Sequence, residues 1–118
     1  MMSQDLPADI QQKIRNFQNL QANLQSLSEQ KYSLDAQLKE ITSAKQFLDT
    51  ATAETKIYKS IGGLMVESTK DKAAADLKEN EEILATRIKK LDMTIEKSKA
   101  KYEEMKNDIN SSLKNRMG

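Results

Sequence analysis

The sequence predicts a mainly α fold, in which two long helices pair as an antiparallel coiled coil and are joined by a central β-hairpin. Three observations predict it: apolar residues recur at a 3,4 spacing through both halves, two adjacent glycines mark the midpoint, and the 118 residues hold only three Gly and one Pro. A 3.5-residue repeat gives a narrow apolar seam that a helix buries only against another helix. We expect one domain over residues 1–118, with a helix at about 6–53, a hairpin at about 56–68 and a second helix at about 69–116.

The first predicted helix carries its seam in two alternating columns. Pro7 suits a first helical turn, because its missing N–H is one that a helix start does not use, and Asp5 and Asp9 favour the positive end of the helix. Most seam positions are apolar, and the polar ones either specify the register or are tolerated there; tolerance is the interpretation that we favour for most of them. The columns are Ile10, Phe17, Leu24, Lys31, Leu38 and Lys45, and Lys13, Leu20, Leu27, Leu34, Ile41 and Leu48.

Two short runs with β-branched or aromatic content flank the central glycines, over residues 56–61 and 64–68. A two-residue loop needs positive φ, which Gly62 and Gly63 adopt at little cost, so the pattern predicts a β-hairpin. Apolar side chains fall on both of its faces, and a lone two-stranded hairpin of this kind is marginal in water. We therefore expect it to pair with neighbouring strands. An irregular turn that caps a helical hairpin is the alternative.

The second predicted helix has two candidate N-caps, Ser68 in a capping pair with Asp71, or Thr69. If the two halves fold back about the glycines, the numbers of facing residues sum to about 122, which places Glu81 beside Lys45. A register displaced by one heptad also fits the pattern. The columns of this helix are Ala74, Glu81, Ile88, Ile95, Tyr102, Ile109 and Arg116, and Leu77, Leu84, Leu91, Ser98, Met105 and Ser112.

Composition argues against most catalytic chemistry. The chain has no His, Cys or Trp, so it lacks an imidazole base, a thiolate and a Cys/His zinc site. The central glycines lie in no phosphate-binding motif. The net charge of +1 gives no basic footprint for nucleic acid, and no window approaches the roughly 20 apolar residues of a membrane span. We therefore expect no enzyme activity, no catalytic residue and no cofactor or metal. We also expect that neither nucleic acid nor a membrane is a partner, and that the protein is cytoplasmic.

The hairpin segment resembles a known family. Residues 57–66 read IYKSIGGLMV and are followed by STKDKA and then Leu77, which resembles the β-type subunit of prefoldin, a co-chaperone of archaea and eukaryotes. A single hairpin separates β-type from α-type subunits. The resemblance implies a hexamer of two α-type and four β-type subunits, in which the hairpins join into a β-barrel platform and the helical pairs hang down as tentacles. It also implies an ATP-independent holdase that grips unfolded polypeptides at the tentacle tips and delivers them to a group II chaperonin.

Two sets of residues follow as candidate sites, one for assembly and one for client binding. Flexible Met and aliphatic side chains suit a promiscuous binding surface at the tip, the end of the helical pair that carries both chain termini. The seam residues among them could equally well pack the two helices together at that end. A structural coiled-coil adaptor that holds no client is the alternative function. The predicted oligomer interface is Ile57, Tyr58, Ile61, Gly62, Gly63, Leu64, Met65 and Val66. The predicted client-binding tip is Met2, Leu6, Ile10, Ile14, Phe17, Ile109, Leu113 and Met117.

Overall fold

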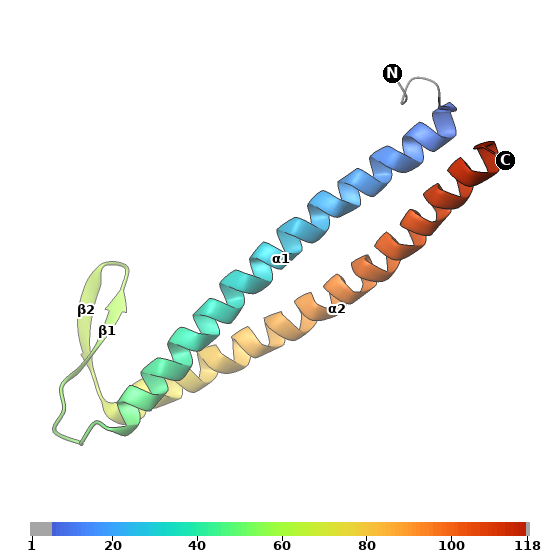
Figure 1. Ribbon diagram of the computed structural model, residues 1–118. Helices are drawn as coiled ribbons and strands as arrows, with labels where there is room; N and C mark the ends of the chain where they lie inside the picture. Colours follow the sequence, from blue (N-terminus) through green and yellow to red (C-terminus); the bar gives the residue numbers. More distant parts are fainter. Residues whose placement is uncertain (1–5, 118) are drawn as a thin grey trace. The chain divides into compact units, whose positions relative to one another are not determined.

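Two long helices with an antiparallel hairpin between them make up the computed structural model, which describes residues 6–117 (Figure 1). The elements are α1 (Ala8–Asp49), β1 (Ile57–Ile61), β2 (Leu64–Ser68) and α2 (Lys70–Met117). This confirms the predicted fold class. The chain divides into two units, a terminal unit of Met1–Lys31 with Lys90–Gly118 and a hairpin unit of Tyr32–Lys89, and both helices run through both units.

Helix α1 is shorter than the predicted span of 6–53 at both ends. It begins directly after Pro7, whose carbonyl accepts the Gln11 N–H at 3.0 Å. At the other end, the N–H groups of Thr50 and Ala51 donate to the carbonyls of Phe47 and Leu48 at 3.1 and 3.0 Å. These are bonds to the third residue back, which tighten and close the last turn.

The segment after α1 has its own local hydrogen bonds. The Thr52 N–H donates to the Thr55 hydroxyl at 3.0 Å, and the two hydroxyl groups lie 3.2 Å apart. Threonine side chains that bond the nearby backbone offer it an alternative to the helical ladder. This competition is the physical reason that the helix ends at Asp49 rather than near residue 53.

The predicted hairpin is confirmed, and the irregular turn is wrong. β1 pairs antiparallel with β2, from Ile57 opposite Ser68 at the open end to Ile61 opposite Leu64 at the turn. Gly62 and Gly63 have φ of 52° and 88°. Positive φ at both loop positions is the signature of a type I′ turn, whose twist matches that of the two strands.

Helix α2 starts on one of the two caps weighed from the sequence. The Thr69 hydroxyl accepts the Lys72 N–H at 3.2 Å, and its carbonyl accepts the Ala73 N–H at 2.9 Å. Ser68 closes β2 instead. Thr69 is therefore the N-cap, and it separates the end of the sheet from the start of the helix within a single residue.

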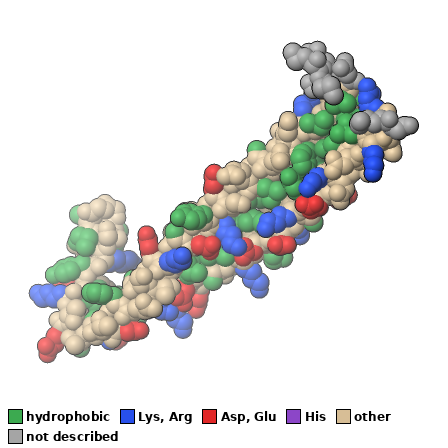
Figure 2. All heavy atoms as spheres, viewed as in Figure 1, with side chains coloured by type: hydrophobic (Ala, Val, Ile, Leu, Met, Phe, Trp, Pro, Cys, Tyr) green, Lys and Arg blue, Asp and Glu red, His purple; other side chains and the backbone are tan. Residues whose placement is uncertain are grey.

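Apart from two positions of α2, the residues of the seam columns are buried or half-buried in both units. The buried apolar residues are Ile10, Ile95 and Ile109 in the terminal unit and Leu48 and Leu84 in the hairpin unit. In the terminal unit, hydrophobic side chains gather along the line where α1 and α2 meet (Figure 2).

Two predicted seam positions are wrong. Ala74 and Arg116 are exposed, and Ala73 is half-buried in place of its neighbour. Both errors lie near the ends of α2, at its fifth residue and in its last turn. A straight helix with 3.6 residues per turn drifts away from a strict 3.5 repeat, so the columns fail first at the ends.

Ion pairs between the helices confirm the predicted register. In the terminal unit, the Lys31 ammonium lies 2.7 Å from Asp92, and in the hairpin unit the Lys45 ammonium lies 3.2 Å from Glu81. A register displaced by one heptad would separate both pairs. Together with Lys13, described below, these seam lysines each have an acidic partner on α2. Their side chains remain about two-fifths exposed, with values of 39–41%, so whether the pairs specify the register or the lysines are tolerated there stays a prediction.

Candidate functional site

The hairpin presents apolar side chains to solvent on both faces. Leu64 is 70% exposed and Met65 66% exposed, and they lie on opposite faces because successive strand residues alternate. The pairing places Ile61 and Val66 on the Leu64 face and Tyr58 on the Met65 face, and all three are exposed. Among the non-glycine residues of the predicted interface, Ile57 is half-buried and the others are exposed.

The turn and the strand edges are equally open. A Cβ atom built on Gly62 or Gly63 would meet nothing within 4 Å. The sheet has two strands within the described residues, so the outer edge of each strand carries unpaired backbone groups. Bare edges beside exposed apolar side chains favour pairing with further strands.

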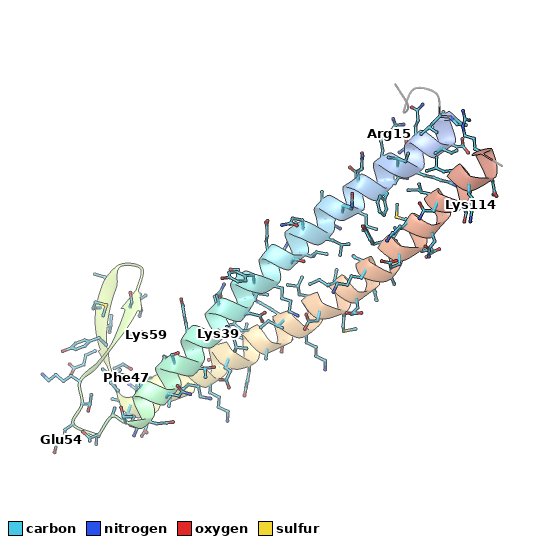
Figure 3. All side chains as sticks on the ribbon, viewed as in Figure 1. Arg15, Lys39, Phe47, Glu54, Lys59 and Lys114 are labelled. Carbon is cyan, nitrogen blue, oxygen red and sulfur yellow. The ribbon has the colours of Figure 1, made fainter. Side chains whose placement is uncertain are left out.

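One ion pair ties β1 to α2, and one hydrogen bond joins the start of α2 to the residues that follow α1. The Lys59 ammonium lies 2.9 Å from the Asp76 carboxylate on α2, and the Lys70 ammonium donates to the Ala51 carbonyl at 2.8 Å. Lys59 lies on β1 and Phe47 lies near the end of α1 (both labelled in Figure 3). The hairpin is therefore tied to α2 through Lys59, while no hydrogen bond or ion pair of the described residues ties its turn end to a helix.

A groove of about 610 Å³ lies between β1 and the helix ends of the hairpin unit. Its apolar lining includes Phe47 and Leu48 from α1, Ile57 and Tyr58 from β1, and Leu77 from α2.

Sequence reasoning missed Phe47, which is 79% exposed. It directly precedes the seam residue Leu48, so it falls outside the seam columns. The signal that was available is a large aromatic residue outside the seam, close to the predicted hairpin.

The terminal unit packs most of its predicted client-binding residues. Ile10 is 6% exposed and Ile109 9%, and the ring of Phe17 stacks on that of Tyr102 with centroids 4.7 Å apart. Leu6, Ile14 and Leu113 are half-buried. Met2 and the side chain of Met117 lie outside the described residues.

A polar contact bridges the helices beside these packed residues. The Lys13 ammonium lies 3.1 Å from the Asp108 carboxylate and 3.2 Å from the Ser112 hydroxyl. Asp92 and Asp108 are further residues that the sequence reasoning missed. Each directly flanks a seam position, so a check of the neighbours of facing positions would have found them.

Within residues 6–117, no group of three or more His, Cys, Asp or Glu side chains is arranged to hold a metal ion. Over the same part of the chain, no helix combines the length and the hydropathy needed to cross a bilayer.

Comparison with known proteins gives one consistent family. A family model described as "Prefoldin subunit" matches residues 11–116. The chain is 31% identical to prefoldin subunit beta of Methanosarcina mazei over 112 residues, which cover 95% of this chain and 96% of that protein. It is 41% identical to prefoldin subunit beta of Thermococcus kodakarensis over 58 residues, or 49% of this chain and about half (50%) of that relative.

A solved structure agrees with these sequence matches. The crystal structure of the prefoldin beta subunit from Thermococcus strain KS-1 superposes with a TM-score of 0.84 at 32% identity. The superposition covers 93% of this chain and 96% of that one. The likeness thus extends over both helices and the hairpin.

Proposed function

Because the chain belongs to the prefoldin family of chaperone subunits, we propose that it is a β-type holdase subunit that works without ATP. In this proposal, residues 1–118 act as one prefoldin-like domain in the cytoplasm. The chain binds unfolded polypeptides through its terminal unit and delivers them to a group II chaperonin. Its partners are prefoldin α-type subunits and further β-type copies, in a hexamer of two α-type and four β-type chains.

The observation that carries the assembly half of the proposal is the hairpin with exposed apolar residues on both faces and two bare edges. Burying one side chain of the size of Leu or Met is worth about 1.5–3 kcal/mol, so several of them together favour strand pairing between subunits. The interface set in this proposal is the one predicted from the sequence: Ile57, Tyr58, Ile61, Gly62, Gly63, Leu64, Met65 and Val66.

The client-binding half is supported by the chemistry of the terminal unit. Leu6, Ile14 and Leu113 offer partly exposed aliphatic surface without a fixed polar pattern, as a site for unrelated apolar segments requires. Ile10 and Ile109 are packed inside the subunit, so they contribute to client binding only when the ends of the helices separate.

The test is aggregation of a chemically unfolded model protein, followed by light scattering after dilution into buffer. The chain is added alone and together with an archaeal prefoldin α-type subunit, and the mass of each sample is measured. We expect suppressed scattering in the sample that contains a hexamer-sized species. A small, stable coiled-coil assembly that leaves scattering unchanged would contradict the holdase and support a structural adaptor.

A further inference from the structure

The groove beside Phe47 follows strand β1. Four consecutive β1 residues, Ile57 to Ser60, line it on one side, and the ends of α1 and α2 line it on the other. Its volume of about 610 Å³ lies within the range of protein pockets that bury a ligand or a few side chains. Because one wall is a strand over most of its length, the occupant that fits best is another extended chain lying alongside it.

The floor of the groove is apolar and incompletely covered. Phe47 and Tyr58 both line it, and both are exposed in the free chain, with Phe47 at 79%. Ala44, Ala51 and Ala73 also line it and leave room for a larger side chain from outside. An aromatic ring beside small residues is a suitable seat for a flexible Met or Leu.

The rim carries a positive charge that lacks a partner. Lys56 lines the groove, is exposed, and makes no hydrogen bond or ion pair within residues 6–117. Lys59 at the same rim is already paired with Asp76. An occupant with an apolar side chain and a carboxylate on one face would therefore match both the floor and the rim.

This chain contains such a segment. Met65 and Glu67 lie two residues apart in β2, so their side chains share one face. Met65 is 66% exposed, and Glu67 is exposed and its carboxylate makes no hydrogen bond or ion pair within the described residues. The turn that leads into β2 is sterically open at both glycines, which allows the end of the hairpin to approach another surface closely.

We propose that the groove beside Phe47 is a second assembly contact, which receives the Met65 and Glu67 face of the hairpin of another copy of this chain. Met65 packs on Phe47, and Glu67 pairs with Lys56 at the rim. The inference rests on the proposed assembly function and adds to it. Strand pairing uses the edges of the hairpin, whereas this contact uses one of its faces.

A disulfide experiment tests the contact directly, because the described chain has no Cys to compete. Chains with Phe47→Cys and chains with Met65→Cys are mixed, alone and with an α-type subunit, and then oxidised. We expect a cross-linked dimer of the two chains at about ten times the level of a control mixture. The control pairs Met65→Cys with Tyr32→Cys, which is as exposed as Phe47 at 79% but lies outside the groove.

Equal cross-linking in both mixtures overturns the inference. So does a Phe47→Cys chain that cross-links only to a cysteine placed in the α-type hairpin or in an unfolded client, because the occupant is then not a second copy. A Phe47→Ser chain provides an independent measure. We expect it to lose about tenfold or more in apparent association by sedimentation, and Tyr32→Ser to lose nothing.

Charge exchange tests the rim. Lys56→Glu and Glu67→Lys each place like charges across the contact, and we expect each to weaken association about two- to fivefold. An equimolar mixture of the two variants restores opposite charges between chains, so association should recover. This mixing separates a contact between chains from one within a chain, where no recovery would follow.

The matched control is the pair Lys39→Glu and Glu40→Lys on the exposed surface of α1, which makes the same changes in net charge outside the groove. Recovery by mixing that is equally large in this control would overturn the rim contact. Unchanged association in Phe47→Ser, without selective cross-linking, would remove the groove contact while leaving the strand-paired platform intact. Failure of the platform itself is detected separately, by the Ile61 and Val66 variant described below.

Discussion

The terminal unit and the hairpin unit treat their apolar residues in opposite ways. The terminal unit buries Ile10, Ile95 and Ile109 and stacks Phe17 on Tyr102. The hairpin unit buries Leu48 and Leu84 but leaves Phe47 and five of the hairpin side chains exposed. One unit therefore completes most of its packing within the chain, and the other has apolar surface that only a partner covers. In the proposed function, the exposed hairpin would supply the free energy of assembly, and client binding at the terminal unit would compete with internal packing.

The largest expected effect is on assembly. Replacing both Ile61 and Val66 with Asp places two charges on one face of the hairpin, where pairing between subunits would desolvate them. We expect loss of the hexamer in sedimentation or native mass measurements, with helix content by circular dichroism largely unchanged. Met93→Asp is the control, because Met93 is also exposed but lies on α2 in the terminal unit. Intact hexamers in the double variant would refute a platform role for the hairpin.

The next effect separates internal packing from exposed surface by stability. Leu84 is 6% exposed, so Leu84→Ala removes packed atoms and should cost about 2–3 kcal/mol in free energy of unfolding. Leu64 is 70% exposed, and Leu64→Ala should change the same quantity by less than about 0.5 kcal/mol in the isolated chain. Urea unfolding of both variants measures the contrast. Equal losses of free energy of unfolding would mean that Leu64 is already packed within the isolated chain.

Trimming the chain should have an intermediate effect on client holding. Removal of residues 1–9 and 111–118 takes away Leu6 and Leu113 while leaving the whole hairpin unit in place. We expect weaker suppression of aggregation, by several-fold in the chain concentration needed, with assembly unchanged. Full activity after trimming would rule out the terminal unit as the client-binding site. Loss of the hexamer would show that the two units do not divide the work as proposed.

The sequence predicts the parts of this fold that depend on local patterns. The 3,4 spacing of apolar residues predicts both helices. The adjacent glycines at the midpoint predict the hairpin, because its turn requires positive φ at both loop positions. The sequence also predicts that Lys45 and Glu81 lie opposite each other, as their ion pair shows. Two helices that pair antiparallel about one connection have few registers in which both apolar seams are buried. The client-binding set is less well supported from the sequence, because heptads alone do not tell a packed Ile10 from a free one.

The groove could not be predicted from periodicity. It exists because α1 ends at Asp49 and the chain leaves the helix through threonine hydrogen bonds, which brings β1 beside the exposed ring of Phe47. A helix that continued to residue 53 would have placed the hairpin differently. The partners of the seam lysines were missed for a similar reason, since Asp92 and Asp108 flank the columns and a search restricted to seam positions passes over them.

The smallest expected effect concerns the ion pairs that connect the helices within each unit. Lys45 and Glu81 are both partly exposed, with side-chain exposures of 41% and 34%, so water screens their attraction. A double-mutant cycle of Lys45→Met and Glu81→Gln should give a coupling energy of about 0.2–1 kcal/mol in urea unfolding, falling as salt is raised. Lys13 and Asp108 in the terminal unit are a second pair of the same chemistry, and Lys13→Met with Asp108→Asn should couple to a similar extent. If client binding requires the terminal unit to open, Lys13→Met should change the suppression of aggregation and Lys45→Met should not. Equal changes in suppression by the two variants would show that both ion pairs act only through the stability of the chain.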